Sequence, residues 1–449
     1  MIPYSQLDKT ALETELRTVT EAYEAVKAKG LKLDMSRGKP GKTQLDLSND
    51  MLKVLSDRED CYDDALDVCN YGNLFGIPSA RKLFAELLDV KPSEVIVGGS
   101  ASLQLMYNLI STAFTHGLLK SPEPWSKRGK VRFLCPAPGY DRHFRITEFF
   151  GMELIPIAMT DEGPDMDAVL QWIKDPSVLG IWCVPKYSNP DGIIYSNRII
   201  HALASMKPAA PDFALMWDNA YCIHEFDGDY VPFPDILRLC AEYGNADMVY
   251  EFASTSKVTF PGAGISCMCA SEANLAYFQK TLGVQIISFD KVNQLRHVRF
   301  LKDKETTLAL MKRHAEILKP RFAAVCDALD REIVSRGIGH YNRPKGGYFV
   351  SLYAMPQTAK RALQLVKEAG VTMTPAGATY PYGQDPFDSN IRIAPTLPPV
   401  EELTVAIDVF CLCLRIAALE PCFAETRKKK RERRRKRFDI RGNTRYNRY

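Results

Sequence analysis

Hydrophobic positions recur along this chain with two different periods. Leu12, Leu16, Val19, Tyr23 and Val26 follow one another at steps of three and four, which predicts an amphipathic helix that ends at Gly30. From about residue 94, short β-branched or aromatic runs alternate with helical segments. The runs that predict strands are Val95–Val97, Val131–Cys135, Leu154–Ile157, Gly180–Val184, Phe213–Trp217, Met248–Phe252 and Ile265–Cys269. Several of them are apolar throughout, so we expect an α/β fold with a mainly parallel sheet covered on both faces.

The pattern changes after this region. A long helical stretch, Lys291–Leu329, precedes a C-terminal unit with fewer strands. In that unit, Tyr348–Leu352 and Ile391–Ala394 are predicted strands, and Gln357–Ala369 and Val400–Ala418 are predicted helices. The sequence therefore predicts a second, smaller α+β unit.

Composition is that of a globular protein, with 46% hydrophobic and 25% charged residues among 449. The net charge of +4 hides an uneven distribution, because residues 427–449 carry a net charge of +11 and the rest of the chain carries −7. The body therefore offers no field that attracts nucleic acid. A basic block of this kind is typical of a disordered tail. It could be an RNA-binding or nuclear-targeting patch, but a solvated appendage is favoured because the body has no complementary basic face.

Membrane, secretory and disulfide-rich classes are not indicated. No apolar run reaches the ~18–20 residues of a membrane-spanning helix, and the first residues lack the layout of a signal peptide. The twelve cysteines are too dilute for a disulfide framework. The closest pairs have C-x-C spacing, which does not match a zinc site. We expect a cytoplasmic protein without a metal.

Candidate chemistry lies in four segments at strand-to-loop transitions. Each has a plain structural alternative: a Gly-Gly-Ser helix cap, a Pro-Asp-Gly turn, an aspartate helix cap and a solvated lysine. Together they supply an anion-binding helix start, an amide, a carboxylate with a nearby tyrosine, and an amine. The segments are Gly98-Gly99-Ser100-Ala101-Ser102, Asn189-Pro190-Asp191-Gly192, Asp218-Asn219-Ala220-Tyr221 and Ser254-Thr255-Ser256-Lys257.

In this order the segments resemble the class I/II aminotransferases, which are fold-type I enzymes dependent on pyridoxal 5′-phosphate (PLP). The resemblance covers about residues 30–415. More narrowly, three stretches are similar to the bacterial aspartate aminotransferase subgroup sometimes labelled MocR-like: Ser36-Arg37-Gly38-Lys39-Pro40, Gly98-Gly99-Ser100-x-Ser102-Leu103 and Thr255-Ser256-Lys257-x-Thr259-Phe260-x-Gly262-Ala263-Gly264.

This resemblance implies a particular domain organisation. Residues 1–50 would form an N-terminal arm and part of the small domain, and 51–305 a large PLP-binding domain with a mainly parallel seven-stranded sheet sandwiched by helices. Residues 306–424 would form the rest of the smaller α+β domain, and 425–449 the basic tail.

The resemblance also implies roles for the residues around the cofactor ring. Lys257 would hold PLP as a Schiff base and then move the substrate's α-proton. Asp218 would face the pyridine nitrogen and keep it protonated. Asn189 and Tyr221 would bond the phenolic oxygen, and Tyr140 would stack on the ring.

Other residues would hold the phosphate and the substrate. Ser100, Ala101, Ser102, Ser254 and Ser256 would surround the phosphate, together with Tyr71 donated by the second subunit of a homodimer. Arg392 would grip the α-carboxylate with its planar fork, which a lysine replaces poorly. Gly38 and Asn189 would approach the same carboxylate.

The chain departs from the usual family pattern at one position. The arginine expected on the phosphate, eight residues past the lysine, is Ile265 here. This departure predicts a variant phosphate site in which another base replaces the arginine, or weaker cofactor retention. For the substrate's distal carboxylate, Arg142, Arg145 and Arg37 are candidates; Arg142 and Arg37 rank first because they lie closest to matched motifs.

The function that this resemblance implies is transamination between aspartate and 2-oxoglutarate by a ping-pong mechanism, with amino acids and 2-oxo acids as the only partners besides a second subunit. Another donor, such as alanine or an aromatic amino acid, or a β-lyase reaction, uses the same cofactor chemistry. An aminotransferase-like transcriptional regulator is a further alternative. We expect it to be wrong, because only about 35 residues precede Ser36 and a DNA-binding domain needs more.

Overall fold

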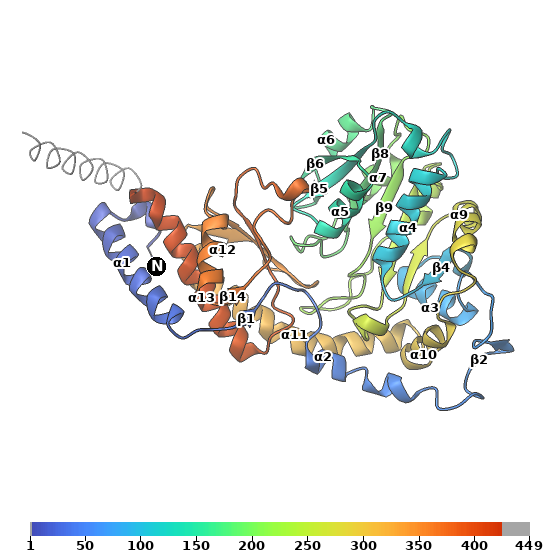
Figure 1. The fold of residues 1–449 in the computed structure, drawn as a ribbon, viewed down its shortest axis with the longest axis horizontal. Helices are drawn as coiled ribbons and strands as arrows, with labels where there is room; N and C mark the ends of the chain where they lie inside the picture. The colour runs from blue at the N-terminus through green and yellow to red at the C-terminus, as the bar shows by residue number, and fades with distance from the viewer. Residues whose placement is uncertain (1, 424–449) are drawn as a thin grey trace, which may run out of the picture.

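The computed structural model describes residues 2–423, and the basic segment 425–449 lies outside the described residues. Two bodies of different size are joined by the long helix α11 (Lys304–Glu332), which runs along one side of both (Figure 1). Each body has its own cluster of buried apolar side chains. Within residues 2–423, no helix combines the length and the apolar composition that a membrane crossing requires.

The larger body is built on an eight-stranded sheet with the order β4-β11-β10-β9-β8-β5-β6-β7. Five neighbouring strands, β10, β9, β8, β5 and β6, pair in parallel. Their sequences are apolar because both faces are covered: β8 and β9 are buried at every position. In sheet order the strands are β4 (Val95–Gly98), β11 (Ser266–Cys269), β10 (Val249–Ser254), β9 (Ala214–Asp218), β8 (Val178–Cys183), β5 (Arg132–Ala137), β6 (Glu153–Thr160) and β7 (Gly163–Pro164).

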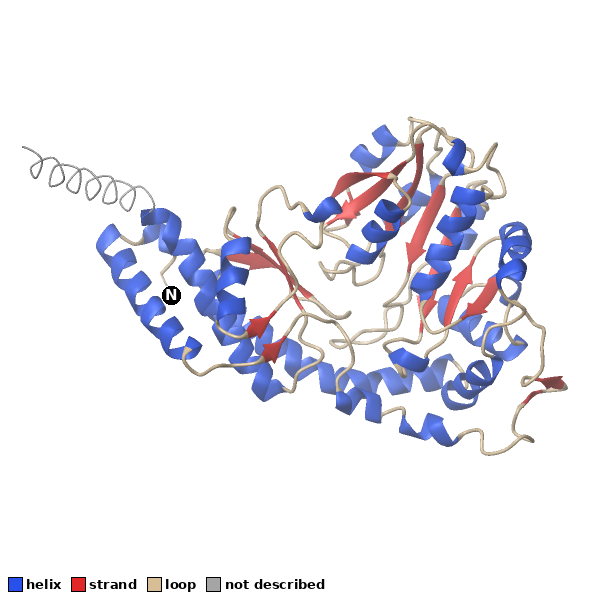
Figure 2. Ribbon diagram, in the orientation of Figure 1, coloured by secondary structure: helices blue, strands red, loops and turns tan. Residues whose placement is uncertain are grey.

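Helices flank this sheet in two groups (Figure 2). One group contains α4 (Ser102–Thr115), α5 (Asp141–Phe149) and α9 (Glu272–Gln285); the other contains α6 (Met166–Trp172), α7 (Asn197–Ser205) and α8 (Ile236–Glu242). At the β4 side, α3 (Pro78–Leu88) packs on β4 and on α10 (Lys291–Leu301). A small hairpin, β2 (Tyr62–Asp63) and β3 (Leu66–Asp67), extends from this end of the body.

The prediction of an α/β fold with a mainly parallel sheet is confirmed, with two differences of detail. The eighth strand, β7, is a two-residue antiparallel edge strand too short to give a periodic signal. The helical stretch predicted over Lys291–Leu329 is two helices, because Lys302 adopts a positive φ of 63° and Asp303 caps a new helix by accepting a hydrogen bond from the Thr306 N–H.

The smaller body combines both ends of the described chain. A three-stranded antiparallel sheet, β12-β13-β15, and a parallel pair, β1-β14, lie beside three helices. The strands are β1 (Leu33–Asp34), β12 (Gly339–Tyr341), β13 (Val350–Ala354), β14 (Val371–Thr372) and β15 (Asn390–Ile393); the helices are α1 (Lys9–Lys27), α12 (Ala359–Glu368) and α13 (Val400–Leu419). A short helix, α2 (Lys42–Asp46), leads from here toward the larger body.

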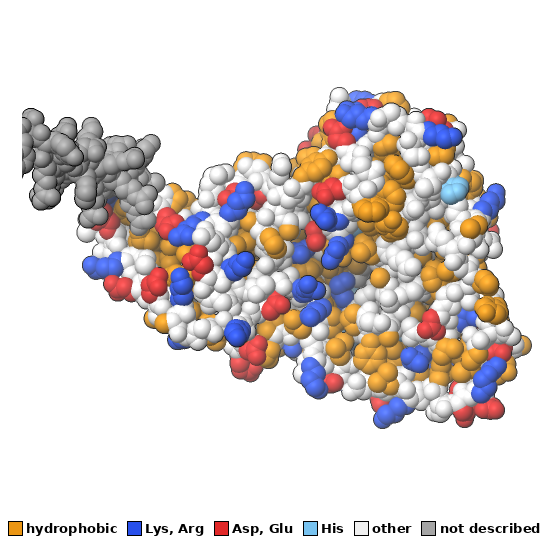
Figure 3. Space-filling model, in the orientation of Figure 1, with side chains coloured by type: hydrophobic (Ala, Val, Ile, Leu, Met, Phe, Trp, Pro, Cys, Tyr) orange, Lys and Arg blue, Asp and Glu red, His pale blue; other side chains and the backbone are white. Residues whose placement is uncertain are grey.

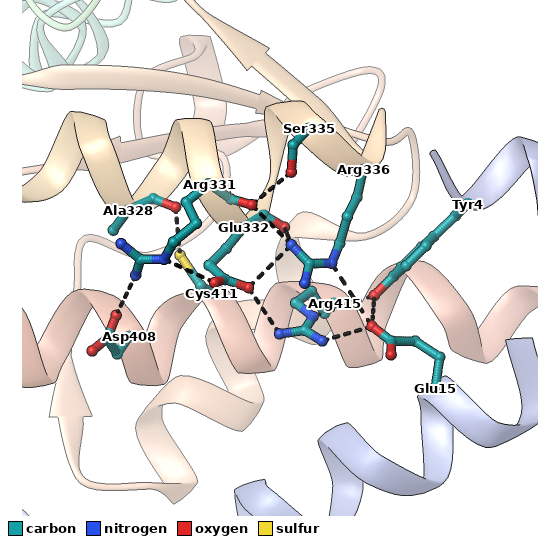
Figure 4. A network of polar contacts seen from close by, with 10 residues as sticks. All are labelled: Tyr4, Glu15, Ala328, Arg331, Glu332, Ser335, Arg336, Asp408, Cys411 and Arg415. Carbon is teal, nitrogen blue, oxygen red and sulfur yellow. Dashed lines mark hydrogen bonds and ion pairs between the residues drawn. The ribbon is translucent and has the colours of Figure 1, made fainter. Parts of the chain in front are cut away.

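An ionic network fastens the N-terminal helix to this body (Figure 4). Arg415 of α13 donates to Glu15 of α1 (2.6 Å) and to Glu332 at the end of α11 (2.9 Å). The hydroxyl of Tyr4 also donates to Glu15, at 2.7 Å. Three helices that are far apart in the sequence are thus held by one arginine.

Candidate active site

The carboxyl ends of the parallel strands meet at one edge of the large sheet, where α/β proteins bind ligands. Asp218 is the last residue of β9, and Ser254 is the last residue of β10. Tyr140 follows β5 closely and Asn189 follows β8. The structure therefore brings the predicted strand-end side chains to one edge. Figure 3 shows Lys and Arg side chains gathered in the hollow between the two bodies.

Lys257 lies in the loop after β10, beside two aromatic rings. Its Nζ is 4.9 Å from the ring centroid of Tyr221 and 5.9 Å from that of Tyr348. Burial lowers the pKa of Lys257, although the negative charge of Asp218 opposes this shift. A lowered pKa leaves more of the amine neutral, so this lysine is suited to act as a nucleophile or a base.

Asp218 has one oxygen bonded and one free. Its Oδ2 accepts a hydrogen bond of 2.9 Å from Nε2 of His143, whose ring stacks on Trp182 with centroids 4.3 Å apart. Its Oδ1 is buried and has no hydrogen-bond partner among residues 2–423. A buried carboxylate oxygen without a donor is costly, so this side chain fits a ligand that presents an N–H group.

Tyr140 and Tyr221 lie in the same neighbourhood. Burial and the nearby charge of Asp218 raise the pKa of Tyr140 to about 12. Burial also raises the pKa of Tyr221, and the negative charge of Asp218 adds to this shift. Both hydroxyls therefore keep their protons at neutral pH and can donate hydrogen bonds.

A cup for an anion lies at the start of α4. Ala101 is the N-cap residue, and no side chain caps the helix N–H groups there. The hydroxyls of Ser254 and Ser256 are 2.9 Å apart, and Ser256 donates to the carbonyl of Ser100 at 3.2 Å. Free helix N–H groups beside hydroxyls form a phosphate site. Ile265 is only 1% exposed and brings no charge to it.

Arg392 reaches the site from β15 of the smaller body. Its Nη1 donates to Asp141 (3.0 Å) and to Asn189 (3.3 Å), and its guanidinium lies 4.8 Å from the ring centroid of Phe349. Its Nε is buried and has no partner within the described part of the chain. Gly38 packs against Phe349 so closely that a Cβ there would lie 2.4 Å from the ring. Arg392 and Gly38 therefore share one aromatic neighbour, and the guanidinium keeps one donor for a carboxylate.

Not every predicted site residue lies in this group. Tyr71 is 80% exposed, on the loop after the β2-β3 hairpin. Arg37 is exposed beside Gly38. Arg142 and Arg145 line a separate surface pocket of about 410 Å³ together with aromatic side chains of α4 and α5. The contact of Tyr71 with a second subunit and the identity of the residue that binds the distal carboxylate therefore stay predictions.

Four residues of the site were not predicted from the sequence: His143, Asp141, Tyr348 and Phe349. His143 and Asp141 follow Tyr140 in the first turn of α5. The histidine three residues after the predicted stacking aromatic is the sequence signal that could have indicated them. For Tyr348 and Phe349, the available signal is the glycine pair that precedes them. At Gly346 a Cβ would lie 2.5 Å from the ring of Tyr187, so only a glycine fits there.

The residues present fit a flat, phosphate-bearing heterocycle. The free oxygen of Asp218 suits a ring N–H, the α4 cup suits a phosphate, and the amine of Lys257 suits an aldehyde. The free Nε of Arg392 suits a substrate carboxylate.

Comparison with known proteins gives consistent results. Residues 7–425 match the family model described as aspartate amino-transferase. The chain is 42% identical over 402 residues to an aspartate aminotransferase of Corynebacterium glutamicum, covering 90% of this chain and 93% of the relative. The crystal structure of an aspartate transaminase from the same species superposes with a TM-score of 0.91 at 41% identity, covering 93% and 99% of the two chains. The fold is also shared with an α-aminoadipate aminotransferase of Thermus thermophilus, at 20% identity and a TM-score of 0.69, over 87% of this chain and 94% of that one.

Proposed function

The chain belongs to the aspartate amino-transferase family, and from this premise we propose that it transfers the amino group of aspartate to 2-oxoglutarate. The observation that carries the proposal is a pair of buried polar atoms without partners among residues 2–423, Oδ1 of Asp218 and Nε of Arg392. Both belong to side chains close enough to Tyr221 to influence its pKa. One atom suits a cationic heterocycle, and the other suits an amino-acid carboxylate.

The cofactor that fits is pyridoxal 5′-phosphate. Lys257 would bind its aldehyde carbon, Asp218 its ring nitrogen and Ser100, Ser102 and Ser256 its phosphate. When bound, it supplies the electron-withdrawing ring that amino-group transfer requires. The similarity of the chain to aspartate aminotransferases over nine-tenths of its length supports this assignment.

Lys257 would carry the proton of the reaction. Its amine, whose pKa is lowered by burial, would take the proton from the substrate α-carbon and pass it to the carbon that was the cofactor's aldehyde. In the opposite half-reaction it would move a proton back to the α-carbon. The tyrosine rings beside Nζ restrict where the amine can move.

Asp218 and its histidine partner would hold the charge that makes proton removal favourable. The bond from His143 fixes the orientation of the carboxylate and leaves Oδ1 free, so Oδ1 would be available to the ring nitrogen. A carboxylate at this nitrogen keeps the nitrogen protonated.

The substrate would be held at both ends. Arg392 and the backbone of Gly38 would bind the α-carboxylate, and Arg142 or Arg37 the distal one. In a homodimer, Tyr71 of one subunit would reach the phosphate of the other; its 80% exposure supports this arrangement. A reducing cytoplasmic location is supported by the twelve cysteines, all of them free.

The test is to supply purified protein with PLP, aspartate and 2-oxoglutarate and to follow oxaloacetate. The bound cofactor is then reduced with borohydride, and the labelled peptide is mapped. We expect turnover in the wild type, a pyridoxyl group on Lys257, and neither in Lys257→Ala. Fast turnover of a neutral donor with none of aspartate would assign a different aminotransferase, and wild-type rates in Lys257→Ala would refute the proposal.

A further inference from the structure

A buried lysine lies at the start of α10, outside the group of residues that forms the candidate active site. Lys291, the first residue of α10, is only 3% exposed. Its Nζ has no hydrogen-bond partner in residues 2–423. A buried ammonium without an anion is strongly unfavourable, so this group is suited to meet a negative charge when the protein binds its ligands.

The start of α10 lies against the anion cup. Phe289, two residues before Lys291, is 3.9 Å from the position that a Cβ would take at Gly99, in the turn between β4 and α4. Two residues after Lys291, Asn293 donates to the carbonyl of Gly264 at 3.0 Å. The first turn of α10 is therefore placed beside both sides of the cup.

The contacts of Gln294 show which face of α10 carries Lys291. Gln294 is one turn beyond Lys291 on the same face, because residues three apart are neighbours on a helix. Its Nε2 donates to the carbonyl of Val97 at 3.4 Å, and its Oε1 accepts from the N–H of Ile77. Lys291 thus shares a helix face with a residue bound to the strand that leads into the cup.

Within the described part of the chain, none of the residues that form the cup carries a positive charge. Its members are hydroxyls and helix N–H groups, and the position where the family pattern has an arginine is the buried, apolar Ile265. A phosphate carries nearly two negative charges at neutral pH, so neutral donors alone leave it undercompensated.

Nearby carboxylates already have other partners. Asp67 is close enough for Lys291 to contribute to its lowered pKa, but its side chain bonds Arg58 and the backbone N–H of Cys69. Asp290 caps α10 by accepting the N–H of Asn293. Neither aspartate bonds the ammonium of Lys291.

We infer that Lys291 supplies the cation of the phosphate site and takes over the task of the arginine missing at position 265. The inference rests on the proposed function, because it names a residue for the phosphate of the same cofactor. Lys291 is a binding residue in this scheme, and it takes no part in proton transfer.

The experiment compares two ligands that differ only in the phosphate. Apo-protein is titrated with PLP and, separately, with pyridoxal, and binding is followed by quenching of tryptophan fluorescence. The variants are Lys291→Met and Lys291→Arg. The matched control is Lys280→Met, which removes the same charge from an exposed position on the neighbouring helix α9.

We expect Lys291→Met to weaken PLP binding roughly 10- to 100-fold, the loss of one hydrogen bond to a charged group. Pyridoxal binding should stay within about twofold, and Lys291→Arg should keep most of the PLP affinity. Inorganic phosphate should compete with PLP in the wild type and much less in Lys291→Met. Unchanged PLP binding in Lys291→Met, or an equal loss for both ligands, would overturn the inference.

A measurement on the wild type covers the case in which Lys291→Met does not fold. PLP and inorganic phosphate should each slow the reductive methylation of Lys291, mapped by mass spectrometry, whereas pyridoxal should not. Equal labelling with and without phosphate would refute the inference. The two proposals fail differently: if the wild type carries no pyridoxyl group on Lys257, the function is wrong, whereas a normal adduct with phosphate-independent Lys291 contradicts only the role of Lys291.

Discussion

Replacing Arg392 with lysine tests how the site would hold its substrate. The guanidinium uses Nη1 for Asp141 and Asn189 and lies over Phe349, with only 9% of the side chain exposed. A lysine can keep the ion pair with Asp141 because it retains the positive charge. It cannot keep that pair and also place a second, fixed N–H donor where the free Nε of the arginine lies.

The expected loss follows from the number of donors. A hydrogen bond to a charged group contributes about 1.5–3 kcal/mol, and the lysine would lose the one that the free Nε of Arg392 can give. Since about 1.4 kcal/mol corresponds to a factor of ten, kcat/KM should fall roughly 10- to 150-fold. Both half-reactions should be affected equally, because aspartate and 2-oxoglutarate each present a carboxylate to the same group.

The assay couples oxaloacetate to malate dehydrogenase and follows NADH absorbance, and single-turnover measurements separate the two half-reactions. The matched control is Arg198→Lys, an exposed arginine of α7 that pairs with Glu162 on the surface. It should stay within twofold of the wild type. A wild-type kcat/KM in Arg392→Lys, with normal cofactor binding, would show that the carboxylate is held elsewhere.

Three further changes give distinct expectations. Glu15→Gln should lower the free energy of unfolding by about 1–2 kcal/mol at pH 7, because it removes the carboxylate that Arg415 bonds. Burial works against ionisation, but hydrogen bonds and nearby arginines give Glu15 a pKa below its ordinary 4.5, so its contribution is present above pH 4.5 and is lost as the pH falls through the lowered value. Gly180→Ala should destabilise the protein by about 1–3 kcal/mol, since its Cβ would lie 2.4 Å from the ring of Phe133. His143→Leu should lower kcat about tenfold, because the carboxylate of Asp218 loses its only side-chain donor among residues 2–423.

Each of these changes has a control. Urea unfolding at several pH values should show the wild type and Glu15→Gln converging in acid; a constant difference would refute the ionic explanation. Gly129→Ala, where nothing lies within 4 Å of the new Cβ, should be neutral in the same unfolding assay. His201→Leu removes an exposed histidine of α7 and should leave kcat unchanged; a wild-type kcat in His143→Leu would contradict the positioning role.

The large sheet could be predicted from the sequence because its strands are buried on both faces. The run Gly180–Val184 is apolar at every position, and residues 178–183 form a strand without an exposed residue. The strand β7 could not be predicted, because Gly163 and Pro164 have no periodicity and form a strand only by pairing with Met159 and Thr160. A strand can therefore be predicted from the sequence when burial requires apolar side chains at many consecutive positions.

The candidate site could be predicted only in part, for a similar reason. Asp218 and Ser254 are conspicuous because a polar residue ends an apolar run. The partner of Asp218 is His143, 75 residues earlier in the chain, and only the parallel pairing of the strands brings the two together. Lys291 gives no local signal either, since its burial depends on how α10 packs against α3 and β4.

The attachment of α1 to α13 has a consequence for biosynthesis. Helix α1 is translated almost four hundred residues before α13, the helix that covers its apolar stripe. Val19 and Tyr23 are nearly inaccessible in the folded protein. During synthesis they therefore stay exposed to water while the residues of the larger body are translated and form their own core. Closure of the smaller body therefore has to await the synthesis of α13, and α1 is the helix of this body that stays uncovered, and open to aggregation, for the longest time.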